Sequence, residues 1–181
     1  KFLTDALELE KQKVPTRKLL EDPYHFWYIG KSYYDSTLGD YPLGMDHIKE
    51  YARRSIFYFG QYLNFKHDYH NTGKAKVIDE LAYFALYAMG DMSKLCGNYE
   101  KALDCGMRAE EFAPLRNEHI VLQAECYKDL SDFDSMKLQT NRLMSPDRKL
   151  PFPEFNFLLN MEHYNDSGKY CEQLHQIANQ V

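Results

Sequence analysis

Three groups of residues in this chain have types and spacings that could carry chemistry, and the first is Asp132-Phe133-Asp134. Two carboxylates one residue apart can hold a metal ion together with the phosphates of a nucleotide sugar. In enzymes that use such a pair it follows a buried strand, whereas here it falls in a turn between two apolar-periodic segments. An aspartate in that position accepts hydrogen bonds from the first backbone N–H groups of a helix. We therefore expect Asp132 to cap a helix and not to bind a metal.

The second group, His67-Asp68-Tyr69-His70, brings two imidazoles and a carboxylate close together in the sequence. It belongs to a polar, turn-rich stretch from His67 to Lys76, and no third metal ligand stands near it. We expect a solvated loop over this stretch and predict no metal site.

The four cysteines form the third group, and none has C-x-x-C spacing or a histidine at metal-ligand spacing. They are Cys96, Cys105, Cys126 and Cys171. We expect reduced cysteines packed between helices, which indicates a cytoplasmic location. Because the sequence also has no G-x-S-x-G motif and no glycine-rich phosphate loop, we predict no catalytic site and no cofactor within it.

The composition is that of a globular protein, with 44% hydrophobic and 27% charged residues. A net charge of -5 argues against a nucleic-acid partner, although Lys49, Arg53 and Arg54 form a short basic strip. No apolar run approaches the roughly 20 residues of a membrane-spanning helix, so we expect no membrane partner. The first residues, Lys1 to Lys13, are amphipathic and unlike a signal peptide, and they begin in mid-pattern without methionine. We expect a domain excised from a longer chain, whose N-terminal part carries the main activity.

Hydrophobic spacing predicts that helices form almost the whole chain, with turns at Gly97–Asn98 and Ser131–Asp132. The segment Phe155–Tyr164 fits a strand or a helix, and a helix is favoured. The other expected helices are Phe2–Lys13, Pro23–Tyr34, Leu43–Leu63, the two halves of Tyr83–Arg116, a helix following Asn117, Phe133–Met144 and Tyr170–Gln180.

One stretch, Tyr83–Arg116, resembles a tetratricopeptide repeat, a helical hairpin of about 34 residues. Counted from Tyr83, Gly90 falls at position 8, Ala102 at 20, Ala109 at 27 and Pro114 at 32. Small residues at these places let two antiparallel helices approach closely, and the proline ends the second helix. A single hairpin of this kind cannot bury its own apolar face, so we expect the rest of the chain to supply its neighbours.

The resemblance implies one domain over residues 1–181, an all-α, right-handed α/α superhelix of stacked helical hairpins. Its repeats would cover about 23–66, 83–116 and 117–148, and residues 155–181 would cap the array. The 60 residues from Gly30 to Gly90 exceed one repeat, so the first repeat is expected to carry an insertion.

A second resemblance rests on a series of motifs that occur in order along most of the chain. It is to the helical-repeat region that follows the catalytic domain in many family-2 glycosyltransferases, and the Pro114–Glu118 segment is its most characteristic piece. The motifs are Asp22–Pro23, FWYIGKSYYD at Phe26–Asp35, DELAYFALYAMGDM at Asp79–Met92, GNYEKALDCGMRAEEFAPLRNEH at Gly97–His119 and FPEFNFLLNMEHYND at Phe152–Asp166.

In tetratricopeptide arrays, a binding groove is lined by first-helix positions that recur every three or four residues. The resemblance assigns to this groove Tyr24, Trp27, Lys31 and Tyr34 in the first repeat, Phe84, Tyr87, Asp91 and Lys94 in the second, and Glu118, Val121, Glu125 and Lys128 in the third. Such a groove is aromatic at one end and mixed in charge at the other. It could stack on a sugar or base, accept a helix of the missing domain, or simply pack against Phe2–Lys13.

These resemblances imply a non-catalytic accessory domain of a glycosyltransferase, which would organise the catalytic domain, an oligomer or a glycan acceptor. The alternative is a stand-alone scaffold that binds a protein partner in its concave groove. The lysine and asparagine set that clamps a peptide carboxylate in chaperone-binding tetratricopeptide domains is missing, so that ligand is not expected.

Overall fold

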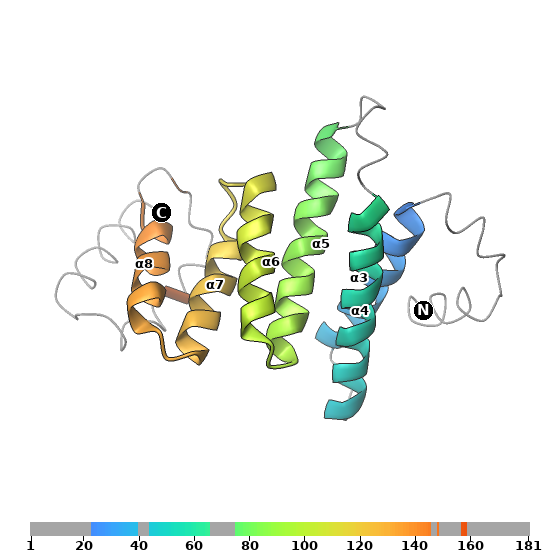
Figure 1. The fold of residues 1–181 in the computed structure, drawn as a ribbon, viewed down its shortest axis with the longest axis horizontal. Coiled ribbons are helices and arrows are strands. Elements are labelled where there is room, and N and C mark those ends of the chain that lie inside the picture. Colours follow the sequence, from blue (N-terminus) through green and yellow to red (C-terminus); the bar gives the residue numbers. More distant parts are fainter. Residues whose placement is uncertain (1–22, 40–43, 66–74, 146–147, 149–156, 159–181) are drawn as a thin grey trace. The chain divides into compact units, whose positions relative to one another are not determined.

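The computed structural model describes residues 23–39, 44–65, 75–145, 148 and 157–158 (Figure 1). This described part contains six α-helices and no strand, so the expected all-α fold is confirmed. Adjacent helices pack as a series of hairpins, as in repeat-like folds. The described residues fall into two compact units, divided between Ala113 and Pro114.

The first unit consists of two hairpins, α3 with α4 and α5 with α6. Helix α5 also packs against α4 and touches α3, so the two hairpins share one core. The elements are α3 (Pro23–Leu38), α4 (Met45–Phe65), α5 (Ala75–Leu95) and α6 (Tyr99–Phe112).

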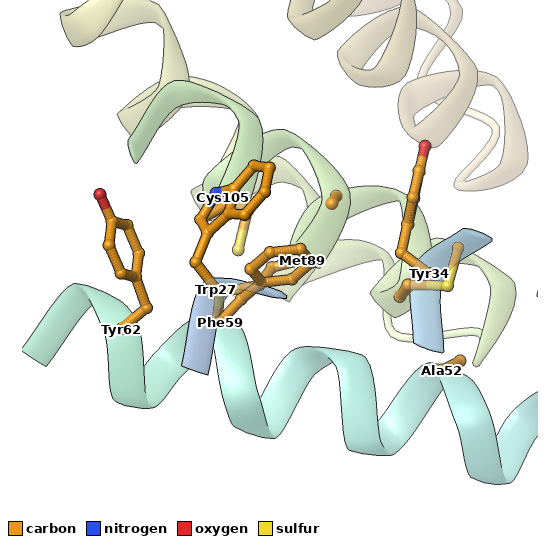
Figure 2. Packing of buried hydrophobic residues seen from close by; sticks show 10 residues of the cluster. Trp27, Tyr34, Ala52, Phe59, Tyr62, Met89 and Cys105 are labelled. Atoms are coloured by element: carbon orange, nitrogen blue, oxygen red, sulfur yellow. The ribbon is translucent and has the colours of Figure 1, made fainter. Parts of the chain in front are cut away.

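The large side chains in this core include four aromatic residues from α3 and α4 (Figure 2). Trp27 and Phe59 meet edge to face with their ring centroids 6.3 Å apart. Alanines, methionines and a cysteine from the other helices fill the space around them, as expected where large side chains pack on small ones. The buried members are Trp27, Tyr34, Ala52, Phe59, Tyr62, Ala85, Ala88, Met89, Met92 and Cys105.

The second unit contains the hairpin of α7 (Glu118–Asp129) and α8 (Phe133–Leu143). Its apolar core joins the two helices to a short helical piece at Phe157 and Leu158. The other buried members are Ile120, Ala124, Met136 and Leu143.

Both predicted turns are present and follow from local chemistry. Gly97 has φ +79°, a conformation that glycine adopts without steric cost, and Asn98 then accepts a hydrogen bond from the Lys101 N–H at 3.1 Å. At the second turn, Ser131 has φ +60° and Asp132 accepts from the Ser135 N–H at 3.1 Å. Asp132 is therefore a helix cap, as the sequence predicted.

The helix boundaries differ from the predicted ones in places. Helix α3 continues four residues past Tyr34, and α5 begins at Ala75, so Ala75 and Lys76 are helical instead of belonging to the loop predicted for His67–Lys76. No residue between Ala75 and Tyr83 breaks a helix, so α5 extends back through good helix formers. Predictions for other segments lie outside the described residues: these are Phe2–Lys13, His67-Asp68-Tyr69-His70, Cys171, Tyr170–Gln180 and Phe155–Tyr164 except for Phe157 and Leu158.

Candidate interaction face on helices α3 and α5

The aromatic residues predicted to line the groove from α3 and α5 lie against one another. The ring of Phe84 is 5.5 Å from that of Trp27 and 5.6 Å from that of Tyr34, measured between centroids. Trp27 and Tyr34 are buried, whereas Phe84 is half-buried. The indole N–H of Trp27 donates to the Leu81 carbonyl at 3.2 Å, which satisfies the one polar atom of that side chain. These two α3 residues therefore pack beneath the accessible surface of α3 and α5 and do not line the predicted groove.

A partly buried polar contact joins the two helices further along. The Tyr34 hydroxyl donates to Asp91 Oδ2 at 3.2 Å. Burial is the main cause that raises the pKa of Tyr34, and the neighbouring Tyr87 and Asp91 raise this pKa further. Tyr34 therefore remains a neutral donor to the Asp91 carboxylate, and this contact fixes the register of α3 on α5.

Lys31 lies beside this contact on the accessible side. Its ammonium is 2.6 Å from Asp35 Oδ2 and lies over the Phe84 ring, 5.7 Å from the centroid. The cation is thus held between a carboxylate one turn along α3 and an aromatic face on α5. Tyr28, on the same helix, is 62% exposed and meets Trp27 edge to face at 5.4 Å.

On α5, all four predicted groove residues are half-buried, while the positions between them are mostly buried. Tyr87 stacks on the buried Tyr83, with centroids 6.4 Å apart and planes 4° from parallel. The four form one stripe with helical spacing and are Phe84, Tyr87, Asp91 and Lys94. With Tyr24, Tyr28 and Lys31 of α3 they make up a surface that we name the α3–α5 face.

The third predicted groove set belongs to α7, in the second unit. Its members are also half-buried and are Glu118, Val121, Glu125 and Lys128. The contacts of two of them can be described. Val121 packs against the apolar core of the unit, and Glu118 holds Arg116 Nη2 at 2.6 Å.

The characteristic Pro114–Glu118 segment has a structural role that the sequence did not reveal. Arg148 donates to the Pro114 carbonyl at 2.8 Å, to the Arg116 carbonyl at 2.9 Å and to Asn117 Oδ1 at 3.2 Å. Arg148 lies 31 to 34 residues further along the chain than these three acceptors. One guanidinium therefore fixes the entry to α7. Local sequence spacing carries no signal for such a contact.

The remaining candidates for chemistry have structural explanations. Burial raises the pKa of the Cys105 thiol to about 11, so this cysteine is a poor nucleophile. In the predicted basic strip, Arg54 pairs with Glu50 at 2.8 Å and lies over the Tyr33 ring at 5.7 Å. Among the residues the structure describes, no three histidines, cysteines or acidic residues cluster as metal ligands. None of the described helices is both long and apolar enough to span a membrane.

Comparison with known proteins found no match, either among family models or among curated proteins. The site is therefore argued from its own geometry. The α3–α5 face combines accessible aromatic rings with charges of both signs on two helices held in fixed register.

Proposed function

We propose that this chain is a non-catalytic, helical-repeat accessory domain of a glycosyltransferase. In this role it organises the catalytic domain or an oligomer, or holds the glycan acceptor, and the sugar transfer takes place elsewhere in the polypeptide. The ordered motifs that resemble the repeat region of family-2 glycosyltransferases support the proposal. So does the hairpin series, because stacked hairpins generally serve as binding scaffolds.

The observation that carries the proposal is the α3–α5 face. Rings at Tyr28, Phe84 and Tyr87 offer apolar surface on which a sugar ring or an apolar side chain can stack. Carboxylates at Asp35 and Asp91 lie beside these rings and can accept hydrogen bonds from hydroxyl groups. Because buried contacts hold both helices in register, the face is preorganised and loses little conformational freedom on binding.

The test compares the full-length gene product with a version that ends just before Lys1. Both are assayed with a panel of nucleotide sugars for donor hydrolysis and for transfer to acceptor. We expect removal of this domain to abolish transfer and to leave hydrolysis intact. If the full-length protein is inactive on every donor, the link to a glycosyltransferase is wrong. If both versions transfer equally well, the role in holding the acceptor is wrong.

A point variant tests the face itself within the full-length protein. Tyr28→Ala removes an accessible ring, and Leu138→Ala on α8 is the matched control, because Leu138 is 61% exposed and Tyr28 is 62% exposed. We expect transfer to fall about tenfold in Tyr28→Ala, the effect of losing one well-placed aromatic contact. Transfer should stay unchanged in Leu138→Ala. Equal transfer by both variants would remove the α3–α5 face from the mechanism.

A stand-alone scaffold that binds a protein partner is the second candidate. The exposure of Tyr28 favours it, since tyrosine is enriched at the centres of protein interfaces. Reading the gene upstream of Lys1 separates the two candidates. About 250 residues of alternating strands and helices, with a D-x-D after a strand, would support the transferase domain. An initiator codon within a few residues of Lys1 would support the scaffold.

A further inference from the structure

Helix α4 has two faces of opposite character. The side that packs into the first unit carries Ala52, Ser55, Phe59 and Tyr62, all buried. The opposite side carries Arg53, Phe57, Gly60 and Asn64, which recur every three or four residues and are exposed or half-exposed. We name this second set the outer face of α4. Since helical spacing places the four residues in one row, they can meet a partner together.

Two residues of the outer face form an unusual combination for a solvated helix surface. Phe57 is 58% exposed, although a single exposed phenylalanine would be ordinary by itself. Gly60 lies one turn further on, in the interior of a helix of 21 residues, where glycine is less favourable than alanine. A Cβ at Gly60 would meet nothing within 4 Å. Packing among the described residues therefore gives no reason for a glycine there, and a large apolar side chain lies beside an open backbone.

We propose that the outer face of α4 pairs with the same face of a second copy of this chain, in antiparallel orientation. A two-fold axis between Phe57 and Gly60 would place the ring of Phe57 of each copy over the bare backbone at Gly60 of the other. A glycine in this position permits the close approach of two helices. The pairing uses both unusual residues at once, and each copy contributes the same contact.

The residue types along the outer face of α4 favour the antiparallel orientation. In that register Arg53 of one copy faces Asn64 of the other, since both lie four residues beyond the central pair. At this register the guanidinium of Arg53 can donate to the amide oxygen of Asn64 of the other copy. A parallel pairing would set Arg53 against Arg53 and Phe57 against Phe57, which costs repulsion and leaves the space at Gly60 empty.

This proposal gives a mechanism for the self-association included in the proposed function, but it does not require a linked transferase. The test uses the 181-residue chain alone and measures its mass by sedimentation over a concentration series. Failure of the glycosyltransferase proposal would leave this result unchanged. Conversely, a monomeric chain would overturn the dimer without bearing on transfer.

Three variants give distinct expectations. Phe57→Gln should weaken dimerisation about tenfold or more, whereas the matched control Leu138→Gln, on α8, should not. Gly60→Ala should weaken dimerisation about tenfold and yet raise the melting temperature of the dilute monomer by roughly 2–4 °C. Alanine favours the helix, and its methyl group meets no neighbour among the described residues. Asn64→Asp should strengthen dimerisation roughly two- to fivefold by pairing with Arg53 of the other copy, and this gain should vanish in an Arg53→Gln background.

The opposite results would overturn the proposal. A wild-type chain that stays monomeric at every concentration would show that a second copy does not cover this face. A dimer that tolerates both Phe57→Gln and Gly60→Ala would lie on a different surface. A dimer that Asn64→Asp weakens in the same way as Phe57→Gln would exclude the antiparallel register.

Discussion

Gly30 of α3 lies directly against the ring of Phe59 of α4. A Cβ at Gly30 would be 3.0 Å from both Cγ and Cδ1 of that ring, tighter than most Cβ contacts in proteins. The side chain of Phe59 is fully buried, and the Ser55 hydroxyl next to it donates to the Gly30 carbonyl at 2.9 Å. Gly30 therefore sets the distance between α3 and α4, and through them the position of Trp27 beneath the α3–α5 face.

Gly30→Ala should destabilise the first unit. The added methyl forces the Phe59 ring to move within a packed core, which typically costs about 1–3 kcal/mol and outweighs the gain of about 1 kcal/mol in helix propensity. The free energy of unfolding, measured in urea on dilute protein, should fall by up to roughly 2 kcal/mol. Gly60→Ala is the matched control in the neighbouring helix and should raise the same free energy, since its Cβ has open space. Equal effects of the two substitutions would contradict the packing assigned to Gly30.

Asp132→Ala should weaken the start of α8. The Asp132 carboxylate accepts from the Ser135 N–H, and the loss of such a cap should lower the melting temperature by a few degrees. Asp134, in the first turn of the same helix, makes no cap contact in the structure, and Asp134→Asn should have a smaller effect. A metal site at this D-x-D would instead require both carboxylates, so equal losses in the two variants would favour that reading.

The pH dependence of α8 should follow the same carboxylate. Hydrogen bonds from the side chain of Ser135 and, to a smaller extent, from its backbone N–H lower the pKa of Asp132 below its usual value of 3.8. A group with a lowered pKa stabilises the fold fully above its unfolded pKa, and this stabilisation is lost as the pH falls through the folded pKa. Protection of the Ser135 amide against hydrogen exchange should therefore decrease as the pH falls below about 4. In Asp132→Asn, which still caps but does not titrate, this decrease should disappear.

The sequence predicted the helices of the described part and both of their turns because the relevant signals are local. Gly97–Asn98 and Ser131–Asp132 contain residues that tolerate positive φ or accept N–H hydrogen bonds within the next turn. The prediction for the start of α5 was wrong. Ala75 and Lys76 favour a helix, but they follow a turn-rich stretch and were assigned to its loop.

Contacts between residues far apart in the sequence could not be predicted from helical spacing. Helical spacing put Trp27, Lys31 and Tyr34 in one set, but it could not show that Phe84, 50 or more positions away, covers Trp27 and Tyr34. The contacts of Arg148 with the entry to α7 were missed for the same reason. Periodicity gives the row on which a residue lies. Which neighbour covers that row depends on tertiary packing.

Arg148→Ala should destabilise the second unit. It removes donors to two backbone carbonyls and to Asn117, and because two of these contacts are exposed, we expect a loss of about 1 kcal/mol in the free energy of unfolding. Arg148→Lys should recover little, since an ammonium cannot reproduce the fork of a guanidinium. Arg108→Ala is the control, because its exposed pair with Asp104, at 3.5 Å, should contribute almost nothing. Full rescue by lysine would show that only the charge matters.

Tyr34→Phe tests the hydrogen bond between α3 and α5. Near neutral pH it removes the donor to Asp91, and the free energy of unfolding should fall by about 1–2 kcal/mol. The pKa of Tyr34 is raised above its usual value of 10.0, mainly by burial. A group with a raised pKa stabilises the fold fully below its unfolded pKa, and this stabilisation is lost as the pH rises toward the folded pKa. The difference between wild type and Tyr34→Phe should therefore shrink above pH 10.

Tyr62→Phe separates burial from the hydrogen bond in this experiment. Burial raises the pKa of Tyr62 to about 12, with smaller effects from Tyr24 and Asp79, so Tyr62→Phe should also flatten the alkaline loss of stability. Near neutral pH it should cost less than Tyr34→Phe, because no hydrogen bond to a described residue contributes to the pKa of Tyr62, whereas the bond to Asp91 contributes to that of Tyr34. Urea unfolding at pH values on either side of 10 measures both differences. If Tyr34→Phe costs nothing at neutral pH, the hydroxyl of Tyr34 does not hold α3 in register, and the α3–α5 face loses the contact that preorganises it.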